Sequence, residues 1–428
     1  MADRYAAGSV RSSAPWPRPA AGRPRPSDRS DRGDRPRGKR PAPPWDDDEL
    51  PPRKGGPKAP LWTKLVIAFG VLAMVGSGLT IAVPKIAAAW LTGNIQQIDA
   101  IPTDLVATSI DGPINFLLLG LDQREGEEAE NRIRADSIVL VHIPASHDVA
   151  YMISFPRDSL VDIPPYPPTK YPGGRDKINA AFANGAVTPD IYGDRDASPE
   201  GWTRGAELTM RTISNLVPGG LKFSGVAIIN FAGFEKVVEA LGVIKNFCVD
   251  EEVYSIHYYP DGQRAQPDLN LVYGDDQTVG KHYPVGCYDM EPWEALDYSR
   301  QRYGLSDGDY GRQRHQQQLL KAIVRQAMSP DVLTNLSTVR KLRDAAGDLL
   351  TLDLGDFGIE EWVFTLSSLR ADDIVMIKTN GGKFHSRIIN DTYYEYLSDE
   401  SLELLQHVQS DTVFDFLARH PDWVATDR

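Results

Sequence analysis

The sequence predicts a layered α/β domain with a largely buried sheet, placed behind a single membrane-spanning helix. Two patterns support this prediction. From Ile114 onward, short apolar runs of strand length alternate with longer segments of helical periodicity, which is typical of helices packed on a buried sheet. Upstream, Leu65–Pro84 is uncharged throughout and has about the 20 residues that a helix needs to cross the hydrocarbon core of a membrane.

The N-terminal tail is predicted to be disordered. Residues 1–60 are rich in Pro, Arg, Asp, Gly and Ser and contain almost no aliphatic side chains. Such a segment cannot offset its ordering entropy by burying apolar surface. A cleaved signal peptide is the alternative interpretation of the apolar segment that follows, but its apolar region would be shorter and closer to the N-terminus.

Basic residues around the apolar segment predict its orientation. Arg53, Lys54, Lys58 and Lys64 precede it, whereas only Lys85 closely follows it. The positive-inside rule therefore places the N-terminus in the cytoplasm and everything after the helix outside the cell membrane. We expect a basic cytoplasmic tail at 1–60, a single transmembrane helix at 61–84, a stalk at 85–110 and one extracellular domain at 111–428.

Strand and helix patterns follow one another through the extracellular part. INFLLLGLD, DSIVLVHIP and VAYMISFP are predicted strands, and the polar turn ASHD separates the last two. A helical pattern at 202–217, a strand at 225–230, an amphipathic helix at 231–241 and a strand at 242–249 come next. From Glu291 the pattern is mainly helical, with DIVMIK as one late strand.

The charge distribution predicts a concentrated anion site. The chain has a net charge of −13, and after residue 64 there are 46−15 = 31 basic and 59−8 = 51 acidic residues, a net charge of −20. A body this acidic repels nucleic acid, so no nucleic-acid partner is expected. Against this background, the segment Tyr298–His315 contains Arg300, Arg302, Arg312 and Arg314. A solvated charged helix face is the structural alternative for such a cluster.

Charged residues also gather where the predicted strands begin and end. Asp122 and Arg124 follow the first strand, Arg132, Arg134 and Asp136 surround the start of the second, and Arg157 and Asp158 follow the third. Carboxylates approached by arginines suit a divalent cation that bridges a phosphate. Each pair alone could be an ordinary surface ion pair, but their recurrence at three strand ends favours one shared crevice.

Helical phase separates two of the C-terminal arginines. If Asp309 caps a helix through GRQRHQQQLLKAIV, Arg312 falls on the same face as Leu319, whereas Arg314 falls on the opposite, outward face. Because burying an arginine is costly unless it meets an anion, Arg312 is the better candidate ligand.

The two cysteines, Cys248 and Cys287, lie in the part predicted to be outside the cell. An even number of cysteines in an oxidising compartment favours a disulfide between them, and two buried free thiols are the alternative. The sequence contains no CxxC or Cys/His metal spacing, so a zinc site is not expected.

Seven short motifs occur in one order between Ile114 and Lys321: LDQR, RADS, SFPRD, KINAA, NFAGF, ALDYSRQR and DYGR. In this order, behind a membrane helix, they resemble the LytR-CpsA-Psr family of membrane-anchored enzymes of the Gram-positive cell wall. The resemblance implies an α/β/α domain around a central mixed sheet, with a lipid-binding tunnel. It also implies a Mg²⁺-dependent phosphotransferase that moves a glycopolymer from a polyprenyl-pyrophosphate carrier onto peptidoglycan.

The resemblance assigns roles to individual residues of this chain. Asp122 and Asp136 would bind Mg²⁺, and either Asp136 or Asp158 would activate the acceptor hydroxyl. The other residues expected in catalysis are Arg134, Arg157, Arg300, Arg302 and Arg312, and those expected to bind substrate are Arg124, Lys177, Asn179, Asp309, His315 and Gln316. His315 stands where the family often has a second arginine, and a neutral imidazole offers one donor in place of a charged fork.

Two other functions use the same residues. With water as the acceptor, the protein would be a hydrolase of the pyrophosphate; without turnover, it would be a regulatory anchor that binds lipid-linked glycan. The sequence leaves open transfer or hydrolysis, the identity of the glycopolymer and the role of residues 331–428.

Overall fold

The computed structural model describes residues 96–121, 133–189, 196–266, 268–273, 280–347 and 350–425. Within these ranges no helix combines the length and apolar character needed to span a bilayer. The predicted tail and the predicted membrane helix Leu65–Pro84 lie outside the described residues, as do Asp122, Arg124 and Arg132.

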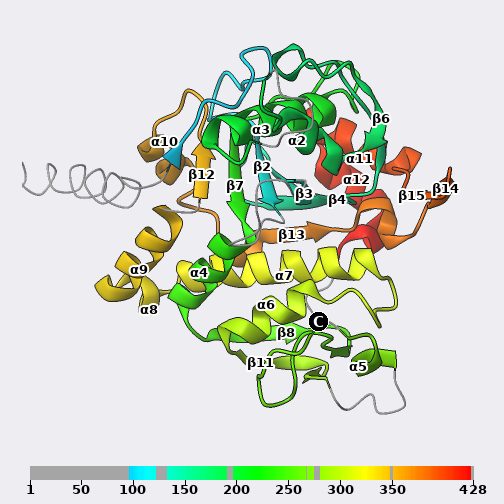
Figure 1. The fold of residues 1–428 in the computed structure, drawn as a ribbon. Coiled ribbons are helices and arrows are strands. Elements are labelled where there is room, and N and C mark those ends of the chain that lie inside the picture. The colour runs from blue at the N-terminus through cyan, green and yellow to red at the C-terminus, as the bar shows by residue number, and fades with distance from the viewer. Residues whose placement is uncertain are drawn as a thin grey trace, which may run out of the picture. The chain divides into compact units, whose positions relative to one another are not determined.

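A seven-stranded mixed sheet is the centre of the fold (Figure 1). Three of its neighbouring pairs show that it is mixed: β2 runs parallel to β7 and antiparallel to β3, and β4 runs parallel to β13. The mixed sheet implied by the family resemblance is therefore confirmed. In spatial order the strands are β1 (Gln96–Gln97), β12 (Leu350–Asp353), β7 (Gly225–Asn230), β2 (Ile114–Leu121), β3 (Ala135–Ile143), β4 (Ala150–Phe155) and β13 (Ile374–Ile377).

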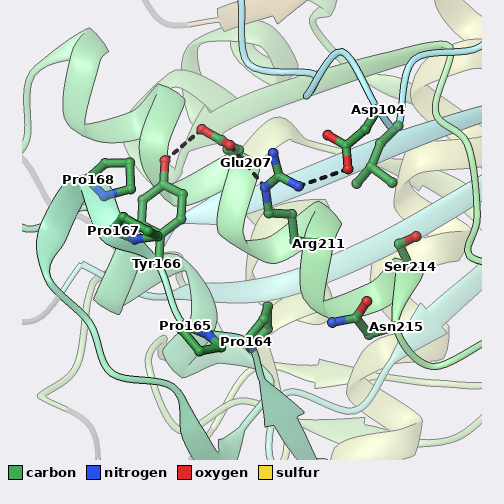
Figure 2. Close-up of a pocket in the computed structure, with 11 residues that line it drawn as sticks. Asp104, Pro164, Pro165, Tyr166, Pro167, Pro168, Glu207, Arg211, Ser214 and Asn215 are labelled. Atoms are coloured by element: carbon green, nitrogen blue, oxygen red, sulfur yellow. Dashed lines mark hydrogen bonds and ion pairs between the residues drawn. The ribbon is translucent and has the colours of Figure 1, made fainter.

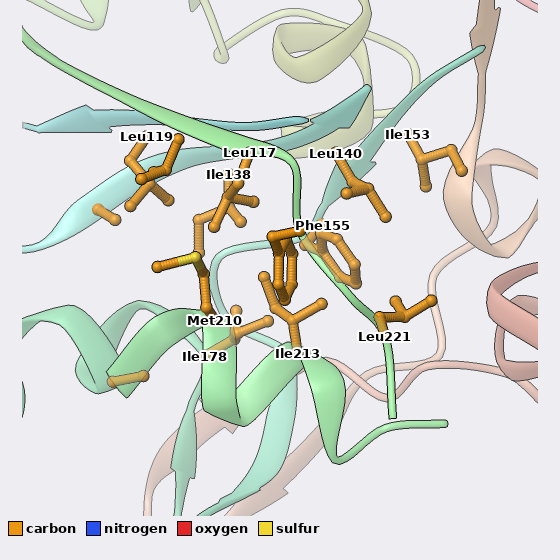
Figure 3. Close-up of a cluster of buried hydrophobic side chains, with 14 of the residues drawn as sticks. Leu117, Leu119, Ile138, Leu140, Ile153, Phe155, Ile178, Met210, Ile213 and Leu221 are labelled. Atoms are coloured by element: carbon orange, nitrogen blue, oxygen red, sulfur yellow. The ribbon is translucent and has the colours of Figure 1, made fainter. Parts of the chain in front are cut away.

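Both faces of the sheet are covered, which explains why its strands are nearly continuous apolar runs. Along β2, Leu117 and Leu119 face one apolar layer, whereas Phe116 and Leu118 face the other. The first layer is covered by α2 (Asn179–Gly185) and α3 (Pro199–Ser214), and Figure 3 shows Met210 and Ile213 of α3 packed below the strands.

The second face of the sheet is covered by α7 (Asp309–Ala327) and α10 (Ile359–Thr365). Leu320 of α7 and Trp362 of α10 pack there against buried side chains of the sheet. α7 also contacts α6 (Pro292–Arg300) on its other side, and together with α4 (Phe231–Leu241) these helices enclose a separate hydrophobic core (Figure 1). α7 is therefore buried on two sides.

The disulfide predicted from the cysteine count is present. Cys248 on β8 (Ile244–Val249) and Cys287 on β11 (Gly286–Met290) are directly opposite in an antiparallel pair, with their Cα atoms 4.0 Å apart. The bond closes a sequence separation of 39 residues beside α6.

The C-terminal segment packs into the same core as the sheet. Leu405 of α11 (Asp399–Gln409) and Phe416 of α12 (Val413–Arg419) belong to the apolar layer that includes Leu117. Two hairpins lie outside the main sheet, β5 (Leu160–Ile163) with β6 (Gly174–Lys177) and β14 (Arg387–Ile389) with β15 (Thr392–Tyr394). The shorter elements are β9 (Val253–Tyr254), β10 (His282–Tyr283), α5 (Asn270–Tyr273), α8 (Pro330–Leu333) and α9 (Leu336–Gly347).

Candidate active site

Charged residues from β3 and β4 meet at one edge of the sheet. Asp136 is the second residue of β3, Arg134 precedes that strand, and Arg157 and Asp158 follow β4. The two strands are antiparallel, with Ile138 opposite Phe155, so the start of one and the end of the other lie together. The prediction that these strand ends share one place is confirmed for the described residues.

Asn179 links two of these groups at the start of α2. Its side-chain amide donates from Nδ2 to Asp136 Oδ1 over 3.2 Å, and its Oδ1 accepts from Arg134 Nη1 over 3.2 Å. Arg157 Nη1 donates to the other oxygen of Asp136. Because arginine only donates and carboxylate only accepts, these partners define which way the Asn179 amide points.

Lys177 reaches the site through the β5–β6 hairpin. Leu160 is paired with Lys177 in that hairpin, which returns the chain to the turn after β4. Lys177 Nζ lies 2.7 Å from Asp158 Oδ1, whereas Asp158 Oδ2 is 3.8 Å from Arg157 Nε, beyond hydrogen-bonding distance.

The first turn of α7 adds Asp309 and Arg312. Arg312 Nη2 lies 2.7 Å from Asp309 Oδ1, and the Arg312 side chain is 13% exposed. Burial lowers the pKa of Arg312; Asp309 opposes this effect, and the positive charge of Arg157 reinforces it. The two guanidinium groups are therefore close enough to repel each other.

For Arg157, neighbouring charges shift the pKa more than burial does. Burial alone would lower its pKa, but the carboxylates of Asp136, Asp309 and Asp158 together raise it. Among the described residues, the Nε atoms of both Arg157 and Arg312 are buried without a hydrogen-bond partner. Each therefore has a hydrogen-bond donor that no acceptor among the described residues satisfies.

The assembled cluster is cationic. Arg302 lies near enough to lower the pKa of Arg312, and its Nη2 donates to Tyr303 Oη over 2.8 Å. Five basic and three acidic side chains make the formal charge of the cluster 5−3 = +2, in a chain whose net charge is −13. We refer to this group as the charged cluster: Arg134, Asp136, Arg157, Asp158, Lys177, Arg302, Asp309 and Arg312.

Not every predicted site residue joins the charged cluster. His315 is fully buried and stacks on Tyr298 of α6 with ring centroids 4.1 Å apart, so the structure does not place it where a substrate could reach it. Burial lowers the pKa of His315 to about 3. Arg300 is the last residue of α6, and both Arg300 and Gln316 are half-buried. Their roles stay predictions, as do those of Asp122 and Arg124 outside the described residues.

The predicted outward orientation of Arg314 is wrong. Its side chain is 11% exposed, and its guanidinium lies 2.6 Å from Asp250 and 2.9 Å from Glu251 and also contacts Asp307. The loops that carry these three acids cover the face of α7 that the apolar periodicity marks as polar. Arg314 is therefore held in a structural ion-pair network.

Glu395 is a residue beside the site that sequence reasoning did not find. Its backbone N–H donates to Asp158 O over 2.9 Å, and its carbonyl accepts from Leu160 N over 2.7 Å. The preceding residue, Tyr394, places its ring centroid 5.7 Å from Lys177 Nζ. More than 200 residues separate these partners along the chain, and no motif marks the hairpin, so only the fold reveals the contact.

A pocket of about 460 Å³ lies elsewhere (Figure 2). One of its lining residues is Leu105, whose carbonyl accepts a hydrogen bond from Phe223 just before β7. The pocket therefore lies near the start of the parallel strands β2 and β7, whereas the charged cluster lies at their opposite end. Its central charges are already paired: Arg211 Nε is 3.0 Å from Glu207 Oε1, and Arg211 Nη1 is 3.1 Å from Asp104 Oδ2. We assign this pocket no role in the chemistry.

Sequence relatives and solved structures resemble this chain over much of its length. A protein named polyisoprenyl-teichoic acid–peptidoglycan teichoic acid transferase TagU, from Enterococcus faecalis, is 27% identical over 242 residues, which cover 56% of this chain and 62% of the relative. Its counterpart from Oceanobacillus iheyensis is 25% identical and covers 69% of this chain and 76% of the relative. The regulatory protein MsrR of Staphylococcus aureus is 27% identical over 58% of this chain and 59% of its own.

Among solved structures, protein gbs0355 of Streptococcus agalactiae has a TM-score of 0.49 at 19% identity, covering 70% of this chain and 88% of its own. B. subtilis TagV has a TM-score of 0.46 at 20% identity, covering 71% of this chain and 98% of its own. The model of the LytR_cpsA_psr family matches residues 92–410, well over half of the sequence, and the chain therefore belongs to the LytR_cpsA_psr family.

Proposed function

We propose that this protein is a cell-wall phosphotransferase that moves a glycopolymer from a polyprenyl-pyrophosphate carrier onto peptidoglycan. The observation that carries the proposal is the pair Arg157 and Arg312, two largely buried guanidinium groups that repel each other and each keep a buried Nε without a hydrogen-bond partner in the described part of the chain. A bound anion such as pyrophosphate would relieve that repulsion and accept those donors. The names of the TagU relatives support peptidoglycan as the acceptor.

The residues of the charged cluster suit phosphoryl transfer, which depends mainly on positioning and on neutralising charge. Arg157 and Arg312 would hold the phosphate oxygens, and Asn179 would keep Asp136 and Arg134 in place. An acceptor hydroxyl oxygen would form a bond to the glycan-linked phosphorus. The bond between the two phosphates would break, and polyprenyl phosphate would leave.

Asp158 is the better candidate for the base. Both oxygens of Asp136 accept hydrogen bonds, from Arg157 and Asn179, whereas Asp158 Oδ2 has its nearest ion-pair partner 3.8 Å away. That oxygen can take the proton of the acceptor hydroxyl. Lys177, 2.7 Å from Asp158 Oδ1, would orient the carboxylate.

Mg²⁺ would be held by Asp136 together with Asp122. Mg²⁺ often uses only one or two protein carboxylates together with water and substrate phosphate. Each oxygen of Asp136 retains a lone pair beyond the hydrogen bond it accepts. When bound, the cation would neutralise charge on the phosphates.

The polyprenyl chain would enter the apolar layer between the sheet and α3, and side chains of that layer would have to move apart to admit it, because they fill the layer in this structure. Ala135, Ile138 and Ile178, which adjoin the charged cluster in sequence, are buried members of this layer, and Figure 3 shows Ile138 on its strand and Ile178 beside Met210 below. An apolar tunnel at this position, a membrane anchor at 61–84 and an extracellular domain are parts of the same proposal.

The test measures where the glycan goes. Full-length protein in lipid nanodiscs would receive a radiolabelled polyprenyl-pyrophosphate glycan, Mg²⁺ and peptidoglycan; label bound to peptidoglycan supports transfer. Arg157→Ala and Arg312→Ala should lower the rate at least about a hundredfold if they stabilise transition-state charge. Arg175→Ala, whose side chain on β6 is 58% exposed, is the matched control and should keep full activity.

Two results would contradict the proposal. Label released only as soluble phosphorylated glycan would identify a hydrolase. Label that stays on the carrier, with tight binding and no turnover, would identify a regulatory anchor.

A further inference from the structure

The β14–β15 hairpin stands out from the fold beside the charged cluster. Figure 1 shows it extending away from the main sheet, and residues 383–393 are exposed throughout. Its turn, Asn390–Asp391, has φ values of 48° and 59°, the left-handed conformation that a two-residue hairpin turn requires and that Asn and Asp tolerate. The hairpin is thus a regular, exposed element.

The base of this hairpin is firmly held. Glu395 is 2% exposed, and its Oε1 accepts from His385 N over 2.6 Å and from Tyr310 Oη over 2.9 Å. Its backbone pairs with Asp158 and Leu160 on the other side. A buried carboxylate is tolerated when donors satisfy it. Here the side-chain contact joins the hairpin to the first turn of α7, and the backbone contacts join it to the Asp158 turn. The Asp158 turn and the first turn of α7 both carry residues of the charged cluster.

The two faces of the hairpin differ in chemistry. Residues directly opposite in an antiparallel pair share a face, so Arg387 and Tyr394 lie on one side and Ile388 and Tyr393 on the other. The Arg387 guanidinium lies 4.8 Å from the ring centroid of Tyr396, and Lys177 Nζ lies 5.7 Å from that of Tyr394. Cations and aromatic rings therefore alternate along the first side, beginning at Lys177.

We propose that this side, formed by Lys177, Tyr394, Arg387 and Tyr396, binds the saccharide of the lipid-linked donor. The inference rests on the proposed function and extends it to the recognition of the glycan. Lys177 is ion-paired with Asp158, so a surface that starts at Lys177 adjoins the bound phosphate. The first sugars of the donor are covalently attached to that phosphate and must emerge beside it.

The chemistry of the surface suits a sugar. Aromatic ring faces pack against the C–H faces of sugar rings, while tyrosine hydroxyls and the cations supply hydrogen bonds to hydroxyl or anionic substituents. A membrane surface would instead use the opposite side, where Ile388 is 74% exposed, compared with 38% for Ile389 on the first side. A bound sugar and a bound membrane therefore lead to opposite expectations for substitutions on the two sides of the hairpin.

The experiment compares two probes on full-length protein in detergent micelles by titration calorimetry. One probe is geranylgeranyl pyrophosphate; the other is the same lipid pyrophosphate carrying one N-acetylglucosamine. Tyr394→Ala should weaken binding of the sugar-bearing probe about tenfold, which equals about 1.4 kcal/mol, and leave binding of the sugar-free probe unchanged. Tyr394→Trp, which retains a ring, should restore most of the affinity. Ile388→Ser, on the opposite side, should bind both probes like the wild type.

Other results would overturn the inference. Equal weakening of both probes by Tyr394→Ala would mean that Tyr394 only supports Lys177 at the phosphate. Unchanged binding of the sugar-bearing probe to Tyr394→Ala, or a loss of binding caused by Ile388→Ser instead, would exclude a donor-sugar surface. Failure of the wild type to bind either probe would refute the proposed function itself, and the inference with it.

Discussion

Removing Arg314 should damage folding and not phosphate binding, because the structure places this residue in an acidic network. Its Nε lies 2.6 Å from Asp250 Oδ2, its Nη2 lies 2.9 Å from Glu251 Oε2, and its Nη1 contacts Asp307. Arg314→Ala would leave three carboxylates facing one another around an empty volume. The same substitution at Arg312 removes a charge that the folded protein compensates poorly.

The size of the effect follows from burial. Breaking a buried ion pair by removing one partner costs roughly 3–5 kcal/mol of stability. Glu251 and Asp307 are 22% and 25% exposed, so water reaches two of the three carboxylates. We therefore expect a decrease of about 2 to 3 kcal/mol in the free energy of unfolding at pH 7, at or just below the lower end of that range.

The effect should depend on pH. Burial is the largest single effect and would raise the pKa of Asp250, but the charge of Arg314 and the hydrogen bonds from Gln318 and Arg314 together outweigh burial, and the pKa is lowered. A carboxyl with a lowered pKa stabilises the fold above its unfolded pKa, and this stability is lost as the pH falls through the folded pKa. The difference between wild type and variant should be largest near neutral pH and shrink below about pH 4.

Thermal and urea unfolding of the full-length protein in detergent micelles, at pH 7 and at about pH 3, measures this difference, with geranylgeranyl pyrophosphate binding at pH 7 as the second readout. Arg312→Ala is the matched control: burial lowers the pKa of Arg312, so its removal should cost little stability while abolishing most pyrophosphate binding. The reasoning is refuted if Arg314→Ala unfolds like the wild type and loses pyrophosphate binding as Arg312→Ala does.

Three further outcomes are expected. His315→Phe should keep the stacking on Tyr298 and full transfer activity, and a large loss of activity would return His315 to the substrate site. Because the pKa of His315 is lowered in the folded protein, the wild type loses about 1.4 kcal/mol of folding stability per pH unit as the pH falls below 6.5. The stability of the variant should therefore depend less on pH than that of the wild type. Replacing both Cys248 and Cys287 by Ser should lower the free energy of unfolding in urea titrations by about 3 to 4 kcal/mol, because the disulfide closes a loop with a sequence separation of 39 residues. Dithiothreitol should have the same effect on the wild type and none on the variant. Asp136→Asn should abolish the increase in pyrophosphate affinity that Mg²⁺ causes in calorimetry, and an undiminished increase would exclude Asp136 as a metal ligand.

The sequence alone located the part of the site that depends on local order. Asp136 and Arg157 lie at strand ends, and strand ends are visible as the limits of apolar runs. Antiparallel neighbours then bring those ends together with little further information. The cysteine pair was likewise predictable, because two cysteines in one compartment have a single possible pairing.

Helical phase predicted the inward orientation of Arg312 correctly and the outward orientation of Arg314 wrongly, and the family resemblance did not reveal that His315 is buried. α7 lies between the sheet on one side and α6 on the other, so it is buried on both sides and a single apolar stripe does not describe it. His315 faces Tyr298, and loops around Asp250 and Asp307 cover the remaining face. Periodicity distinguishes a buried face from a solvated one, but it carries no signal when polar side chains are buried by ion pairs.

The contact of the β14–β15 hairpin with the charged cluster was decided by tertiary structure alone. Glu395 meets Asp158 because β13, a strand late in the sequence, pairs with β4 and brings the C-terminal segment to the end of that strand. Strand order in a mixed sheet is set by which buried faces fit together over the whole domain, and pairing between strands more than 200 residues apart leaves no periodic trace in either segment. The sequence by itself therefore predicted which residues would carry phosphate chemistry, and the packing of distant strands decided which surface lies beside them.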